Sequence, residues 1–291
     1  MNFQISNDMI LVRELLNITQ KELADALNVE YLTINRIENK INNPSKKTIE
    51  AFYNYVYENK IYLNKIKEMF YLEELIDEKL LFHGAKNIID GEIDIDRSRK
   101  NNDFGQGFYC GESYEQSASF VENYQDSCIY YYAFNDSDLK CKKYNVNQEW
   151  MLTIAYFRGQ LKKYENTPII KQLILKLKNV DYVIAPIADN RMFRIIDSFI
   201  NGEITDEQCK HCLAATNLGF QYILLNNKAI SQLRELECCY FSKEERKEYR
   251  KLKNEDNKIS EDKVKLARIQ YRGKGQYIDE ILKWEVLIIM D

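Results

Sequence analysis

Two glycines, Gly105 and Gly107, run directly into the aromatic pair Phe108 and Tyr109. Glycine tolerates backbone angles and close approaches of neighbouring atoms that a β-carbon forbids. A G-x-G sequence before aromatic residues therefore predicts a strand edge at which a flat ligand lies against the backbone.

A helix is expected directly after this strand, from Ser113 to Val121, with Ser113 as its N-cap. Helical spacing places Ser117 and Phe120 on one face. If Tyr109 ends the strand and Phe120 stands on the helix, two aromatic rings face each other across a slot. Because offset stacked rings attract, such a slot suits one aromatic ring of a ligand.

The composition is that of a globular chain and not of a disordered one. Of 291 residues, 45% are hydrophobic and 12% aromatic, and the length favours about two domains. The net charge of −4 means that contact with nucleic acid requires a local basic patch. Seven cysteines, no secretory signal and no apolar run long enough to span a membrane favour reduced thiols in the cytoplasm.

The first sixty residues are expected to form short helices. Thr19 and Glu22 form an S/T-x-x-E capping box that starts one helix, and Asn28 can end it in a left-handed turn. A second helix is expected from Tyr31 to Asn39, and Ser45 is expected to cap a further helix that runs through Tyr57. The apolar positions predicted for the second helix are Leu32, Ile34 and Ile37.

The run T-Q-K-E-L-A-D-A-L-N-V-E-Y-L-T-I-N-R-I-E-N-K resembles the helix-turn-helix of the Cro/repressor (Xre) type. The resemblance implies a recognition helix over 30–39 that enters the major groove of DNA. The sequence departs from the family at Lys40, where glycine is usual, and at Glu30, whose negative charge would face an anionic ligand. A helical protein–protein module is the alternative. The implied DNA-binding residues are Gln20, Tyr31, Thr33, Asn35 and Arg36.

Residues 60–79 are expected to form a connecting helix with one apolar face through Leu63, Ile66, Met69 and Phe70. This helix could serve as a spacer or as a dimer contact.

The sequence beyond residue 79 resembles the NAD-binding half of ADP-ribosyltransferases of the H-Y-E class. Three motifs carry this resemblance: H-G-A at 83–85, then F-G-Q-G-F-Y, then a helix with S-A-S-F. The sequence also looks like an uncharacterised bacterial family with D-F-G-x-G-F-Y that is often found beside toxin–antitoxin genes. The resemblance implies an α+β fold: a split β-sandwich of two packed sheets with helices, attached to the all-helical N-terminal domain. Strands are expected at 128–134 and 182–185.

The resemblance implies a role for each matching residue. His83 would hold the adenosine ribose, and Gly84 and Ser117 would bind the nicotinamide carboxamide. Tyr109 and Phe120 would stack on the nicotinamide ring, which agrees with the slot predicted from spacing.

The third motif of the family departs at its central residue. In the expected strand 220–225, Gln221 stands where the family has a glutamate that bonds the nicotinamide ribose and stabilises an oxocarbenium-like transition state. Glutamine accepts the hydrogen bond but carries no charge. Loss of a charged stabiliser costs on the order of 10²–10³ in rate. Glu149 or Asp189 could supply the charge, a strong nucleophile on the target could need less stabilisation, or the domain could bind NAD without turnover.

Several other polar groups have open assignments. Asn190 or Arg191 could position a phosphate or the target, or could form a helix cap or an ion pair, and a basic group at 97–100 could meet the pyrophosphate or lie in solvent. The pair Cys209 and Cys212 has no second ligand pair, so we expect no metal site.

Residues 241–291 are expected to be a charged helical surface appendage, with a basic nucleic-acid-binding arm as the alternative.

The sequence thus predicts a helix-turn-helix domain over 1–59, a connecting helix over 60–79, an ADP-ribosyltransferase-like domain over 80–240 and the appendage. The expected activity is NAD-dependent transfer of ADP-ribose to a macromolecular acceptor, in a bacterial toxin or phage-defence role. Tyr109 and Gln221 are the expected catalytic residues. NAD, DNA, an unidentified acceptor, an antitoxin and a second copy of the chain are the expected partners. The alternative is a transcriptional regulator whose second domain binds NAD or a partner without catalysis.

Overall fold

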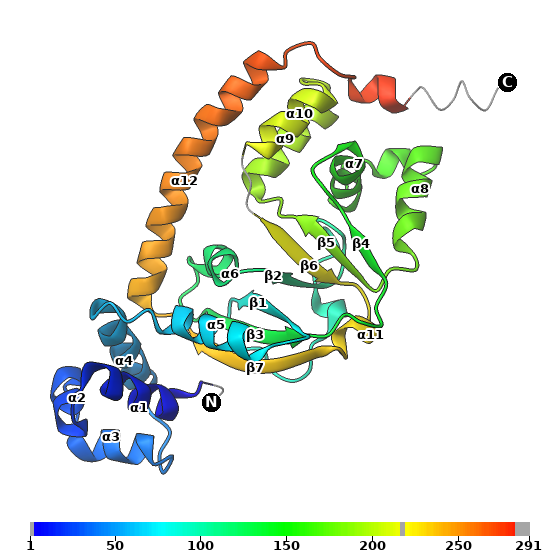
Figure 1. Ribbon diagram of the computed structural model, residues 1–291. Helices are drawn as coiled ribbons and strands as arrows, with labels where there is room; N and C mark the ends of the chain where they lie inside the picture. Colours follow the sequence, from blue (N-terminus) through cyan, green and yellow to red (C-terminus); the bar gives the residue numbers. More distant parts are fainter. Residues whose placement is uncertain (1–2, 216–218, 283–291) are drawn as a thin grey trace. The chain divides into compact units, whose positions relative to one another are not determined.

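The computed structural model describes residues 3–215 and 219–282 (Figure 1). Contacts divide the chain into two compact units, each assembled from separate segments. The first unit comprises residues 1–90, 113–135 and 233–253. The second comprises residues 91–112, 136–232 and 254–291. The expected α+β fold class is confirmed, because both units carry strands and helices.

Four short helices begin the first unit, and local capping explains their limits. The predicted capping box of Thr19 and Glu22 is present at the start of the second helix, and Asn28 ends that helix with a φ of 54°. Ser45 accepts a hydrogen bond from the backbone N–H of Thr48 at the start of the fourth. Lys40 adopts a φ of 58°, a conformation that normally favours glycine. The four helices are α1 (Ile5–Leu16), α2 (Gln20–Leu27), α3 (Tyr31–Glu38) and α4 (Lys46–Glu58).

The buried face of α3 is narrower than predicted. Ile34 and Ile37 are buried, whereas 52% of Leu32 is exposed. The prediction for Leu32 was wrong because helical spacing leaves this residue beside Tyr31 on the side of α3 that faces away from Ile34 and Ile37.

The expected connecting helix is shorter than predicted and buries a different face. Helix α5 (Leu63–Glu74) buries Leu63, Asn64 and Lys67. Met69 and Phe70 of the predicted apolar face are more than half exposed. The prediction was wrong because a buried lysine and asparagine, which periodicity assigns to solvent, are held by polar partners distant in the sequence.

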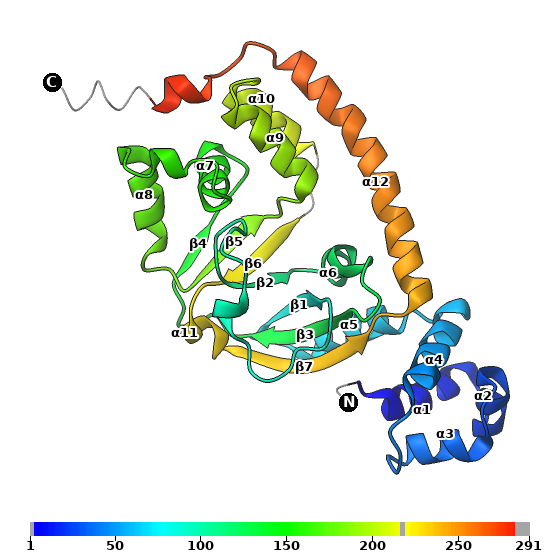
Figure 2. The same cartoon turned by 180° about the vertical axis from the view of Figure 1, so that it is seen from behind.

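Among its described residues, the first unit also contains three antiparallel strands, which can be followed in Figure 2. Strand β3 (Cys128–Phe134) is wholly buried and lies between β1 (Lys79–Ala85) and β7 (Leu233–Tyr240). Helix α6 (Tyr114–Val121) contacts β1 and β3, and Ser113 caps it as predicted, in a capping box with Gln116. The predicted limits of β3 are confirmed.

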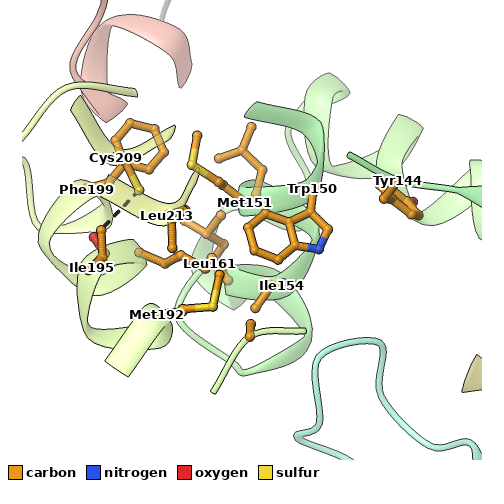
Figure 3. Packing of buried hydrophobic residues seen from close by; sticks show 14 of the residues in the cluster. Tyr144, Trp150, Met151, Ile154, Leu161, Met192, Ile195, Phe199, Cys209 and Leu213 are labelled. Carbon is orange, nitrogen blue, oxygen red and sulfur yellow. Dashed lines mark hydrogen bonds between the residues drawn. The ribbon is translucent and has the colours of Figure 1, made fainter. Parts of the chain in front are cut away.

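The described part of the second unit contains four strands in the order β4 (Cys141–Lys143), β5 (Tyr182–Pro186), β6 (Phe220–Leu224) and β2 (Phe108–Gly111). Its apolar core includes Trp150, Met151, Leu161 and Phe199 (Figure 3). The helices of this unit are α7 (Gln148–Phe157), α8 (Pro168–Leu177), α9 (Asn190–Ile200), α10 (Asp206–Ala214) and α11 (Asn227–Ile230), with 3₁₀ turns at Ile95–Arg97 and Lys162–Tyr164.

A long charged helix, α12 (Lys243–Gln270), starts in the first unit. Its beginning is not the expected surface appendage, because Phe241, Ser242, Glu245 and Arg246 are buried there. The end of the expected appendage, from position 283 onward, lies outside the described residues. No helix in the described ranges is both long enough and apolar enough to cross a membrane.

Candidate functional site

The predicted DNA-binding residues divide into exposed side chains and side chains engaged within the domain. Tyr31 and Arg36 on α3 are exposed, and Thr33 is half-buried. These three can reach a ligand without disturbing other contacts.

Gln20 and Asn35 take part in a network around a buried carboxylate. The Gln20 amide donates to Oε2 of Glu38 over 2.7 Å and accepts from the Asn35 amide over 3.1 Å. Arg13 closes the network with two bonds to Glu38, of 2.6 and 2.8 Å. Gln20 and Asn35 therefore position α2 against α3, in addition to any contact they make with DNA.

The first unit brings two of the predicted NAD-binding residues together. A β-carbon on Gly84 of β1 would lie 2.5 Å from the backbone oxygen of Ser117 on α6, which is closer than non-bonded atoms approach. The Ser117 hydroxyl donates to the backbone oxygen of Phe82 over 2.9 Å. The tight packing of α6 on β1 therefore requires the glycine, and the serine hydroxyl holds the helix there.

His83 and Phe120 flank this contact in the first unit. His83 is half-buried in β1 and pairs in register with Tyr130 of β3. Phe120, one turn beyond Ser117 on α6, exposes 52% of its surface. An aromatic ring so exposed has a face available to a flat ligand.

Tyr109 and Gln221 lie on neighbouring strands of the second unit. Gln221 of β6 pairs with Gly111 of β2, and Tyr109 lies two residues before Gly111, so both side chains emerge on one face. The Tyr109 hydroxyl donates to the oxygen of Gly105 over 2.8 Å and accepts from the N–H of Phe104 over 3.1 Å. Burial raises the pKa of this phenol, so it stays protonated.

Gln221 contacts a carboxylate that sequence reasoning did not single out. Its Nε2 lies 3.0 Å from Oδ2 of Asp103 and 3.4 Å from the backbone oxygen of Pro186. Asp103 also pairs with Arg158, whose Nε and Nη2 lie 2.7 and 2.5 Å from Oδ1. Asp103 is the first residue of the D-F-G stretch, and its place there was the sequence signal that could have identified it. Nothing in the sequence pointed to Arg158.

The alternative sources of charge are otherwise engaged. Glu149 pairs with Lys142 and Lys176 at 3.2 and 3.1 Å. Oδ2 of Asp189 lies 3.2 Å from Nε of Arg191, so Arg191 forms the ion pair that was left open for it. The cap of α9 is Asp189 and not Arg191. The side chain of Asn190 lies outside the described part of the structure. Arg97 is exposed and pairs with Asp94. Neither Glu149 nor Asp189 contacts Gln221 through a hydrogen bond found among the described residues.

Cys209 and Cys212 pack in the apolar interior of the second unit. The Cys209 thiol donates to the backbone oxygen of Ile195 (Figure 3), and the Cys212 thiol donates to that of Val264. His211 stacks on Tyr271 with ring centres 3.5 Å apart. Within the described ranges, no group of three or more histidine, cysteine, aspartate or glutamate side chains is arranged to hold a metal ion.

The predicted NAD-binding residues thus fall into two sets. Gly84, Ser117, His83 and Phe120 belong to the first unit, and Tyr109 and Gln221 to the second. In the first unit the Ser117 hydroxyl bonds to the Phe82 oxygen, and in the second the Gln221 amide bonds to Asp103.

Residues 79–234 match the family described as protein of unknown function, DUF3990. Residues 10–52 match the family described as helix-turn-helix. No curated protein and no solved structure matches the chain.

Proposed function

Because this chain belongs to the DUF3990 family of proteins of unknown function, we propose a function from its own residues. The proposal is an NAD-dependent ADP-ribosyltransferase that acts on a macromolecule and carries a DNA-binding helix-turn-helix domain. The helix-turn-helix match over residues 10–52 supports DNA binding through the N-terminal domain.

In the proposed reaction, the bond between the nicotinamide nitrogen and ribose C1′ breaks, and nicotinamide leaves with the bonding electron pair. An acceptor atom of the macromolecule forms the new bond to C1′ and loses a proton. The resemblance assigns contact with the nicotinamide ring to Tyr109 and Phe120, orientation of its amide to Gly84 and Ser117, and contact with the distant ribose to His83. Holding the reacting groups in place lowers the barrier because their freedom is lost on binding and not in the transition state.

The orientation of the Gln221 carboxamide is the observation that carries the proposal. Two acceptors, Asp103 and the Pro186 carbonyl, both face its nitrogen. The amide oxygen is therefore directed away from them and has no partner among the hydrogen bonds of the described residues. An oxygen held in this way beside Tyr109 can accept a hydrogen bond from a ribose hydroxyl.

A transcriptional regulator that binds NAD without turnover is the second candidate. It is favoured by the neutral Gln221 and by the pairing of Asp103 with Arg158, which leave little net negative charge near the proposed ribose position. A cation-like transition state gains less from such surroundings than from an unpaired carboxylate.

The test is incubation of the full-length protein with NAD⁺ labelled in its ADP-ribose part, together with separate protein, DNA and RNA fractions. We expect nicotinamide release and label on one fraction, and we expect Tyr109→Ala to lose both. Tyr277→Ala, which removes an exposed ring of the second unit, is the matched control. NAD binding in calorimetry without nicotinamide release would support the regulator, and absence of both would overturn the proposal.

A toxin or phage-defence role, an antitoxin partner and a homodimer remain part of the proposal. Toxicity on expression, relief by a neighbouring gene product and the mass of the particle in solution are the corresponding measurements.

A further inference from the structure

We infer that Asp103 is a positioning residue that fixes and polarises the Gln221 carboxamide, so that the negative charge needed near the ribose is supplied through an amide. This inference rests on the proposed ADP-ribosyl transfer. It assigns the charge and the ribose contact to two side chains that are 118 positions apart in the sequence.

The surroundings of Asp103 are those of a carboxylate held in one orientation. The residue is buried, and it receives hydrogen bonds from the Arg158 guanidinium and the Gln221 amide. Arg158 is fixed in turn, because Nη2 donates to the Ala188 oxygen over 2.8 Å and the guanidinium lies over the Phe193 ring at 4.1 Å. Burial raises the pKa of Asp103, while Arg158 acts in the opposite direction and favours the ionised form.

An ionised acceptor on the nitrogen side of an amide changes the oxygen side. Hydrogen bonds to charged groups are stronger than neutral ones, and bonds in a chain polarise one another inside a protein. The Asp103 carboxylate draws positive charge toward Nε2 of Gln221 and so leaves more negative charge on Oε1. The oxygen that faces the ligand becomes a better acceptor and is also prevented from turning inward.

The same contact explains why glutamine suits position 221. A glutamate there would place a second carboxylate about 3.0 Å from Asp103, where the amide nitrogen now lies. Two carboxylates at this distance do not both ionise readily, so one would take up a proton. With Asp103 present, an amide is the side chain that bonds to it and still presents an oxygen.

Exchanging the two side-chain types provides the test. In Asp103→Asn, the oxygen of the substituted amide stays with Arg158 and its NH₂ group faces Gln221, so the glutamine amide flips and its oxygen points inward. We expect kcat for nicotinamide release to fall by roughly 10- to 100-fold, with KM for NAD changed by less than about threefold. Gln221→Glu is expected to lose activity as well, because two carboxylates at this distance must share a proton or move apart, and either change disturbs the orientation of the side chain at 221.

The double variant D103N/Q221E should recover activity to within about tenfold of the wild type. In that protein the substituted amide donates to one oxygen of the substituted carboxylate, and the other oxygen faces the ribose. Asp262→Asn, an exposed aspartate of the second unit paired only with Lys265 among the described residues, is the matched control and should behave as wild type. Thermal unfolding of the wild type, the two single variants and the double variant gives an independent measurement of whether the two positions are coupled.

The outcomes separate the inference from the proposed function. If the wild type turns over NAD but Asp103→Asn is as active as Asp262→Asn, the inference is wrong and the function stands. If both single variants lose activity and the double variant is no better than either, the inference is also wrong. If the wild type releases no nicotinamide, the proposed function fails and the inference falls with it, whether or not the unfolding temperatures show coupling.

Discussion

The ammonium nitrogen of Lys67 on α5 lies 2.8 Å from both carboxylate oxygens of Asp8 on α1. The same nitrogen bonds to Glu237 on β7, and both carboxylates also accept a tyrosine hydroxyl, from Tyr53 and Tyr71 respectively. The helix-turn-helix region is therefore joined to the strands of the first unit through a buried ionic cluster and not through a free linker.

Lys67→Met should lower the free energy of unfolding by about 3–5 kcal/mol, because it leaves two buried carboxylates without their cation. Urea denaturation of the full chain measures this. Lys65→Met, on the same helix, removes a lysine that pairs with Glu68 and Glu115 at a partly exposed position, and its cost should stay below about 1 kcal/mol. Equal destabilisation by the two variants would contradict the structural role of the cluster.

Glu245 should make stability depend on pH in a defined window. Burial raises its pKa to about 7 from the ordinary 4.5, although Tyr114 and Asn64 donate to it over 2.8 and 3.0 Å. Between these two pH values the folded chain holds a proton that the unfolded chain releases. This contribution to stability therefore falls as pH rises from about 4.5 to 7, by about 3 kcal/mol at most, and is constant above.

The measurement for Glu245 is the free energy of unfolding from pH 4.5 to 8, compared between wild type and Glu245→Gln. The variant cannot titrate at this position, so its stability should fall less across the window. The adjacent Glu244→Gln, at a partly exposed position beside Lys247, should retain the slope of the wild type. If the stability of Glu245→Gln fell with pH as steeply as that of the wild type, Glu245 would not be the group that titrates in this window.

Gly84→Ala should displace α6 from β1. The added β-carbon would meet the Ser117 oxygen at 2.5 Å and the Val121 side chain at 3.1 Å, so we expect a loss of about 1–3 kcal/mol in stability and weaker NAD binding. Gly91→Ala serves as the control: it has a φ of 80° but no atom within 4 Å of the added carbon, so its cost is limited to backbone strain. Thermal unfolding and calorimetric titration with NAD measure the two effects, and a Gly84→Ala protein that binds NAD as the wild type does would exclude the proposed amide contact.

Arg36→Gln should weaken binding to duplex DNA. It should also make the slope of the logarithm of the binding constant against the logarithm of salt concentration shallower by about 0.9, the value for one phosphate contact. The residue is exposed on α3 and has no ion pair among the described residues. Lys60→Gln removes the same charge from an exposed position outside the four short helices and should leave the slope nearly unchanged. Fluorescence anisotropy at several salt concentrations measures the slope, and equal slopes for both variants would argue for the protein–protein alternative.

Local sequence signals were enough to predict helix ends and several strands. The caps at Thr19, Ser45 and Ser113 depend on residues three positions apart, so the sequence contains all of their information. The buried face of α5 could not be predicted, because Lys67 is buried only through carboxylates 59 and 170 positions away. The Asp103–Gln221 contact was hidden for the same reason, since no spacing rule connects these two positions.

The assembly of the first unit from three separate segments has a consequence for biosynthesis. The four short helices leave the ribosome well before Glu237 and Glu245, which emerge only after most of the second unit has been made. Until then, Lys67 and Asn64 lack part of their bonding, and the face of α5 that they occupy has no β7 to cover it. A ribosome that stops before residue 237 thus releases a product in which the helix-turn-helix region lacks part of its buried ionic connection to the strands.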